Sequence, residues 1–178
     1  MKFSQFNSSS STEVIELYTQ VFSLSENEEE GKIIGNLVSN LIETTKPHDL
    51  IGFVAISSNR VVGCIFFSRL IVSSNELVFM LSPVAIATEE QGKGLGQQLI
   101  NHGLSYLKSK NINLEFTYGD PNYYSQVGFK PISESIVSAP FKLSQPEWWV
   151  AQSLDGSVIN AIQGLPQCVE AFNNQAYW

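Results

Sequence analysis

PVAIATEEQGKGLGQQLINHGLSYL, residues 83–107, changes from an extended apolar segment to an amphipathic one across a loop that holds three glycines in five residues. After the loop, apolar residues recur at the spacing of one helix face: Leu95, Leu99, Ile100, Leu104 and Leu107. Glycines let the backbone approach a ligand closely, and the N–H groups at a helix N-terminus favour a phosphate. We therefore predict a strand, an anion-binding loop and a helix in succession.

The glycine spacing excludes two common nucleotide-binding motifs. A Walker A loop needs Gly-Lys followed by Ser or Thr, whereas Lys93 is followed by Gly94. A dinucleotide fingerprint has the spacing GxGxxG, whereas Gly92, Gly94 and Gly96 give GxGxG. For this loop taken alone, a glycine-rich turn that binds no ligand is the alternative.

The residues before the loop predict a strand, two helices and a set of longer strands. Lys2–Phe6 alternates as a strand does, and apolar residues recur at helical spacing over residues 14–22 and 33–42. A serine followed three residues later by a glutamate predicts a capping box at each helix start: Ser10 with Glu13, and Ser25 with Glu28.

A hairpin follows, with strands at Leu50–Ser57 and Arg60–Val72 joined by a Ser58-Asn59 turn. Glu76–Ala87 is a third extended segment, and Pro83 must interrupt its hydrogen-bond ladder because proline has no N–H to donate.

The residues after the central helix predict three further elements. Asn113–Tyr118 is a strand, Asn122–Val127 a short helix, and Phe129–Ile132 the start of another strand. Beyond Pro140 the pattern assigns no element. With no internal repeat and no linker composition, residues 1–178 are expected to form one domain of mixed α/β class.

Composition narrows the classes of function. A net charge of −7 with only 10 lysines and arginines argues against a nucleic-acid partner and favours, if anything, a cationic acceptor. No apolar run is long enough to span a membrane, and no signal peptide is recognisable. Cys64 and Cys168 are expected as buried thiols, since no CxxC or Cys/His cluster suggests a disulfide or metal site. We expect a cytoplasmic protein with no metal and no membrane contact.

Two motifs together resemble those of one family. Residues 91–96, QGKGLG, are similar to the Q/R-x-x-G-x-G/A signature of the GNAT acetyltransferases. Residues 123–129, YYSQVGF, resemble that family's aromatic-Tyr-x-x-x-Gly-Phe segment, and the form GDPxYY at residues 119–124 resembles a bacterial subgroup. The resemblance covers about residues 50–132. It implies a GNAT fold, a mostly antiparallel sheet splayed at its middle and flanked by helices, with residues 133–178 completing the sheet and the acceptor side.

The resemblance also implies a cosubstrate, acetyl-CoA, and a reaction, direct attack of an amine on its thioester. Backbone groups of Val84, Ala85 and Ile86 would bind the pantetheine arm and polarise the thioester carbonyl. The loop and first helical turn would bind the pyrophosphate: Gln91, Gly92, Lys93, Gly94, Leu95, Gly96 and Gln97. Tyr124 would bind the cosubstrate and give a proton to the departing thiolate.

The general base and the acceptor are not assigned by the sequence. Met80 stands where some relatives carry a glutamate, while Glu76 and Glu115 are weak candidates. The acceptor is an amine of a small molecule or of a protein, and Trp148 and Trp149 either line its pocket or pack the core. The chain is a possible homodimer. A GNAT-like sensor or scaffold that binds acyl-CoA without turnover is the main alternative, and a nucleotide-binding domain of another fold is a third.

Overall fold

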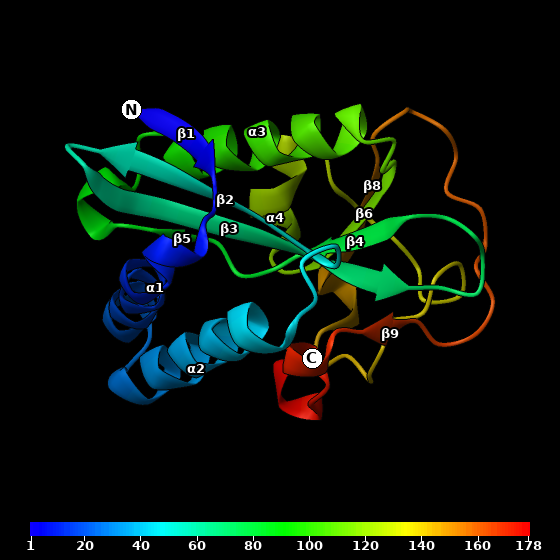
Figure 1. Ribbon diagram of the computed structural model, residues 1–178. Helices are drawn as coiled ribbons and strands as arrows, with labels where there is room; N and C mark the ends of the chain where they lie inside the picture. Colours follow the sequence, from blue (N-terminus) through cyan, green and yellow to red (C-terminus); the bar gives the residue numbers. More distant parts are fainter.

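The computed structural model describes residues 1–178, which form a single mixed sheet between two layers of helices (Figure 1). The strands are β1 (Lys2–Gln5), β2 (Leu50–Ser57), β3 (Arg60–Ile71), β4 (Val78–Leu81), β5 (Ala85–Ile86), β6 (Leu114–Tyr118), β7 (Lys130–Pro131), β8 (Trp149–Ser153) and β9 (Gln167–Cys168). The α-helices are α1 (Ser11–Ser25), α2 (Glu28–Thr44), α3 (Leu95–Ser109) and α4 (Pro121–Tyr124). The 3-10 turns are η1 (Ser8–Ser10), η2 (Thr88–Glu90), η3 (Ser125–Val127), η4 (Pro146–Trp148), η5 (Glu170–Phe172) and η6 (Gln175–Tyr177).

The sheet is mostly antiparallel and open. Its strand order is β1-β2-β3-β4-β6-β8-β7, with β5 and β9 paired to β3 at its two ends. Only β4 and β6 run parallel, and α3 makes the crossover between these two halves of the sheet. Helices α1 and α2 lie on one face, while α3 and α4 lie on the other (Figure 1). The predicted fold class is confirmed.

The sheet opens at its middle, where the third predicted strand is broken by Pro83. Its first half, β4, pairs with β6 only as far as Met80, opposite Phe116. Its second half, β5, pairs only with β3, at Gly63 and Cys64. Residues 82–84 belong to no strand, so β6 has no neighbour on that side beyond its first three residues. The interruption expected from the proline is confirmed, and it leaves a gap between the two halves.

Helices α1 and α2 pack as an antiparallel pair on the sheet, but neither begins with the predicted capping box. The Ser10 side chain makes no cap, and the Glu13 carboxylate instead accepts the Val61 N–H of β3 at 2.8 Å. Helix α2 is capped by Asn27, whose side chain accepts the Glu30 N–H at 2.9 Å. The first prediction failed because Glu13 bonds to β3, and the second because Asn27, closer to the helix start than Ser25, supplies the cap.

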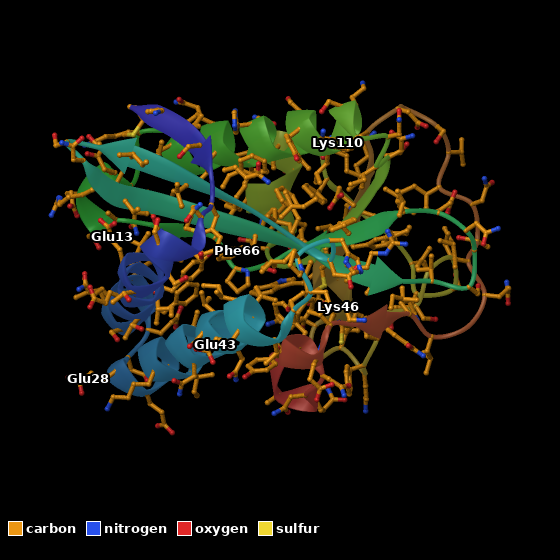
Figure 2. All side chains as sticks on the ribbon, viewed as in Figure 1. Glu13, Glu28, Glu43, Lys46, Phe66 and Lys110 are labelled. Carbon is orange, nitrogen blue, oxygen red and sulfur yellow. The ribbon has the colours of Figure 1, made fainter.

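The core fills both faces of the sheet. On the α1/α2 face, Phe66 of β3 points toward the two helices (Figure 2) and lies beside Phe6 and Tyr18. On the segment that the sequence left unassigned, Trp149 of β8 is fully buried, stacks on Phe116 at 4.9 Å and donates from Nε1 to the Val137 carbonyl. None of the helices is both long enough and apolar enough to cross a lipid bilayer.

Candidate active site

A cleft of about 780 Å³ enters the molecule at the gap in the sheet. Helices α1 and α2 form one wall, the glycine loop and the start of α3 form a second, and the C-terminal segment closes a third. Residues from all of these segments line it: Val21, Phe22, Glu30, Ile34, Leu37, Met80, Leu81, Ser82, Pro83, Val84, Ile86, Glu90, Gln91, Gly92, Gly94, Leu95, Gly96, Gln97, Thr117, Tyr118, Tyr123, Tyr124, Phe172, Ala176, Tyr177 and Trp178.

The glycine loop presents a row of free backbone donors to this cleft. None of the N–H groups from Gly92 to Gln97 donates a hydrogen bond to another group of the protein, because they precede the first full turn of α3. Gly92 and Gly94 have φ angles of 71° and 75°, in the region that side chains disfavour, and this conformation turns the chain into the helix. Six adjacent donors at a helix N-terminus are a site for a phosphate or diphosphate.

The side chains around this loop hold it in shape rather than adding charge. Gln91 donates from Nε2 to the Ile86 carbonyl at 2.8 Å, which ties the loop to β5. The Lys93 ammonium lies 3.1 Å from the Glu90 carboxylate and is not part of the cleft wall. Ten residues besides Lys93 were predicted to bind the cosubstrate. All of them line the cleft except Ala85, which is buried.

The break between β4 and β5 leaves one backbone donor without an acceptor. The Val84 N–H makes no hydrogen bond in the protein, whereas the carbonyl of the preceding Pro83 accepts from the Tyr18 hydroxyl at 2.6 Å. Tyr18 is fully buried on α1, and its hydroxyl also lies 2.9 Å from the Cys64 carbonyl of β3. Since the Pro83–Val84 peptide is trans, its N–H points away from Tyr18.

Tyr124 stands on the opposite side of the gap, at the end of α4. Asp120 caps this helix, because its side chain accepts the Asn122 N–H at 2.8 Å, and Pro121 is the first helical residue. The Tyr124 ring packs edge-on against Phe129 at 5.9 Å and directly over Gly119, where an added Cβ would lie 2.4 Å from the ring. The phenol is thus held in one position.

Burial raises the pKa of Tyr124 to about 12, against the opposing effect of the nearby Thr117 hydroxyl. Thr117 itself donates to the Leu81 carbonyl at 3.0 Å, across the end of β4. A phenol with this pKa stays protonated throughout the neutral range, so Tyr124 can donate a proton but cannot act as a base there.

None of the three positions considered for a general base supplies a carboxylate to the cleft. Met80 lines the cleft and supplies no carboxylate. Glu76 is exposed and bonded to the Ser74 hydroxyl, and Glu115 is fully buried outside the cleft wall. The carboxylates that do line the cleft are Glu30 and Glu90, and the second is paired with Lys93.

Two residues of the site were missed by sequence reasoning. Tyr18 was predicted only as part of an apolar helix stripe, although a buried tyrosine hydroxyl needs an acceptor and so signals a specific contact. Trp178 lines the cleft, whereas Trp148 and Trp149, the tryptophans considered for an acceptor pocket, do not. No local pattern marks Trp178, because it reaches the cleft through long-range packing against Tyr118.

Comparison with known proteins agrees with this geometry. Residues 48–131 match the family described as "Acetyltransferase (GNAT) domain". The uncharacterized N-acetyltransferase YjhQ of Escherichia coli (strain K12) is 27% identical over 152 residues, 82% of this chain and 80% of the relative.

Solved structures share the fold. The GNAT family N-acetyltransferase YhbS from Escherichia coli, in complex with CoA, superposes with a TM-score of 0.81 at 24% identity, over 97% of this chain and 92% of that one. A GNAT family acetyltransferase from Brucella melitensis, in complex with acetyl-CoA, gives 0.67 at 20% identity, over 97% of both chains. Residues 48–131 are thus similar to a GNAT acetyltransferase domain, and the chain as a whole has the fold of these solved GNAT structures.

Proposed function

We propose that this protein is an N-acetyltransferase that moves the acetyl group of acetyl-CoA to an amine by direct attack in a ternary complex. The observation that carries the proposal is the row of unpaired N–H groups from Gly92 to Gln97, at one end of a cleft that reaches the free Val84 N–H and Tyr124. The related structures with CoA and acetyl-CoA support the choice of cosubstrate. In this proposal residues 1–178 act as one catalytic unit.

The free donors fit the chemical groups of acetyl-CoA. The N–H groups of residues 92–97 bind the pyrophosphate without help from a side-chain cation, because the helix dipole and the donors together favour an anion. The gap between β5 and β6 takes the pantetheine arm as a false neighbouring strand, with the backbone of Val84 and Ile86 along it. Ala85 serves by pairing β5 with β3, opposite Cys64, rather than by lining the cleft.

The chemical step uses one backbone donor and one proton donor. As the C–N bond forms, negative charge develops on the thioester oxygen, and the Val84 N–H donates to it. As the C–S bond breaks, Tyr124 gives its proton to the sulfur, and solvent restores that proton afterwards. The amine passes its own proton to water. Tyr18 is a positioning residue, because its bond to the Pro83 carbonyl fixes the direction of the Val84 N–H.

Calorimetric titration of acetyl-CoA, combined with a thiol-release assay on a panel of amines, tests the proposal. We expect binding at micromolar strength, about −8 kcal/mol, and release of CoA only when an amine is present. Absence of acetyl-CoA binding contradicts the proposal outright. Binding without release on any amine favours the alternative, an acyl-CoA sensor.

Tyr18→Phe tests the positioning of the Val84 N–H. The ring stays packed against Phe66, but the Pro83 carbonyl loses its donor at a cost of about 1–3 kcal/mol in stability. We expect kcat to fall about tenfold, because complete loss of an oxyanion donor costs about 10²–10³ and this one is displaced rather than removed.

The readouts for this variant separate positioning from general damage. The Kd for acetyl-CoA should stay within about twofold, since the Tyr18 hydroxyl bonds only to the Cys64 and Pro83 carbonyls and not to the loop that binds the pyrophosphate. Tyr106→Phe, whose half-buried ring lies on α3 outside the cleft, is the matched control and should change neither kcat nor Kd. A Tyr18→Phe enzyme with wild-type kcat rules out the positioning role.

A further inference from the structure

The cleft has a second end, beyond the gap, that the acetyl-CoA contacts proposed above do not use. It lies between α2 and the C-terminal segment, whose η5 turn contacts α2 near the C-terminal end of that helix (Figure 1). The C-terminal segment is pinned there by its own bonds: Trp178 Nε1 donates to the Phe172 carbonyl at 3.1 Å, and Gln175 Nε2 donates to the Lys142 carbonyl at 2.6 Å. The wall is therefore formed by fixed side chains.

Aromatic rings dominate this end. Trp178 stacks with Tyr118 at 6.3 Å and with Phe141 at 6.0 Å, and Phe172 meets Tyr177 edge-on at 6.2 Å. Phe22 of α1 lines the cleft opposite them. Such a wall binds apolar and aromatic groups by burial, and its ring faces attract a cation.

The charges in the cleft are of one sign. No lysine, arginine or histidine is among the residues that line it. The Glu30 carboxylate lines it from the first turn of α2, half-buried, and forms none of the ion pairs of the chain. An anionic group on an acceptor would find no partner here, whereas one ammonium group would find one carboxylate.

A neutral polar group stands at the boundary with the gap. The Ser82 hydroxyl lines the cleft, its residue is 3% exposed, and the hydroxyl has no hydrogen-bond partner in the protein. A buried hydroxyl that has no partner in the protein is free to bond to a ligand group. Since Ser82 directly precedes Pro83 and the free Val84 N–H, an amine bound to this hydroxyl would lie beside the position of the thioester carbonyl.

We propose that the acceptor is a primary monoamine with an apolar or aromatic body and no anionic group, bound where the rings and Ser82 line the cleft, with Glu30 as the unpaired carboxylate of the same cleft. This inference rests on the proposed acetyl transfer. It excludes free amino acids and phosphorylated amines as good acceptors, because their anionic groups would be buried unpaired. It also disfavours polyamines, because the wall offers a single unpaired carboxylate.

Matched acceptors test the class directly. 2-Phenylethylamine and L-phenylalanine differ only in the α-carboxylate, and the methyl ester of phenylalanine keeps the bulk without the charge. We expect kcat/KM for phenylethylamine to exceed that for phenylalanine by about 100-fold or more, with the ester close to phenylethylamine. Equal turnover of phenylalanine, or a preference for spermidine or for a lysine-containing peptide, overturns the inference.

Glu30→Gln tests the carboxylate. We expect KM for phenylethylamine to rise about tenfold with the Kd for acetyl-CoA unchanged, because the lost pair is one partly screened ion pair. The matched control is Glu28→Gln, at the outer end of the same helix and exposed (Figure 2), which should leave both constants as they are. Equal effects of the two substitutions contradict the role of Glu30.

Failure of this inference is distinguishable from failure of the proposed function. If acetyl-CoA binds and a different class of amine is acetylated, the acceptor class is wrong and the acetyl transfer stands. If acetyl-CoA is not bound or no amine is acetylated, calorimetry of phenylethylamine with the protein, with and without CoA, still decides the acceptor class. Binding that Glu30→Gln weakens supports it, and absence of binding overturns it.

Discussion

Replacing Tyr124 with Phe should lower kcat by about 10²–10⁴-fold, the range for loss of a positioned general acid. The ring remains packed against Phe129 and over Gly119, so neither the fold nor the Kd for acetyl-CoA should change by more than about twofold. Without the phenol, the thiolate of CoA must leave unprotonated or take its proton from water. Thiol release in single-turnover conditions measures this step directly.

The pH profile gives a second test of the same assignment. The pKa of Tyr124 is raised by burial to about 12, so its acid form is present at every pH below about 11. The rate should rise with pH as the amine loses its proton, and it should show no descending limb between pH 7 and 10. A descending limb in that interval that Tyr124→Phe abolishes would contradict the pKa, and a Tyr124→Phe enzyme as fast as wild type would remove Tyr124 from the mechanism. Tyr106→Phe again serves as the control.

Glu115→Gln should stabilise the protein, and by more at pH 8 than at pH 5. Glu115 lies on β6, is fully buried, and neither of its carboxylate oxygens has a partner. Burial raises the pKa of this carboxyl well above its usual value, so the folded state keeps the proton that the unfolded state releases. The free energy of unfolding of the wild type is therefore highest below the pKa that Glu115 has in the unfolded state. It falls as pH rises toward the pKa of Glu115 in the folded state, by at most about 1.4 kcal/mol per pH unit.

A glutamine cannot ionise, and it can donate to the Gln152 side-chain oxygen, which is also buried without a partner directly across the strand pair. Urea unfolding of both proteins at pH 5 and pH 8 measures the effect as a difference that grows with pH. Glu76→Gln, at an exposed position, should show no such growth. If the difference between wild type and Glu115→Gln is the same at both pH values, Glu115 does not titrate between the folded and unfolded states in this range.

The elements that were predicted correctly are those whose signals are local. The glycine loop was predictable because the positive φ angles at Gly92 and Gly94 favour glycine. The break in the strand at Pro83 was predictable because proline has no N–H to donate. The short helix that holds Tyr124 was predicted over Asn122–Val127, and it begins one residue earlier, at Pro121, where the Asp120 side chain caps it. In each case the deciding interaction lies within a few residues of the pattern that predicts it.

What the sequence did not reveal depends on contacts between distant residues. Glu13 leaves its own helix end to bind the Val61 N–H, 48 residues away, and Tyr18 bonds to Pro83, 65 residues away. Trp149 packs in the core because it stacks on Phe116, and Trp178, for which the sequence suggested no role, is set at the cleft by a bond to Phe172. Such partners are known only once the fold is known.

The two ends of the cleft differ in how freely they can change over evolution. The donors from Gly92 to Gln97 are backbone N–H groups, so a substitution of Lys93 or Gln97 leaves them in place. Only the backbone conformation of the loop must stay unchanged. The opposite end consists of side chains on α2 and on the C-terminal segment, and each can be exchanged singly. In the proposed acetyltransferase, point substitutions there can therefore change the acceptor while acetyl-CoA remains the donor.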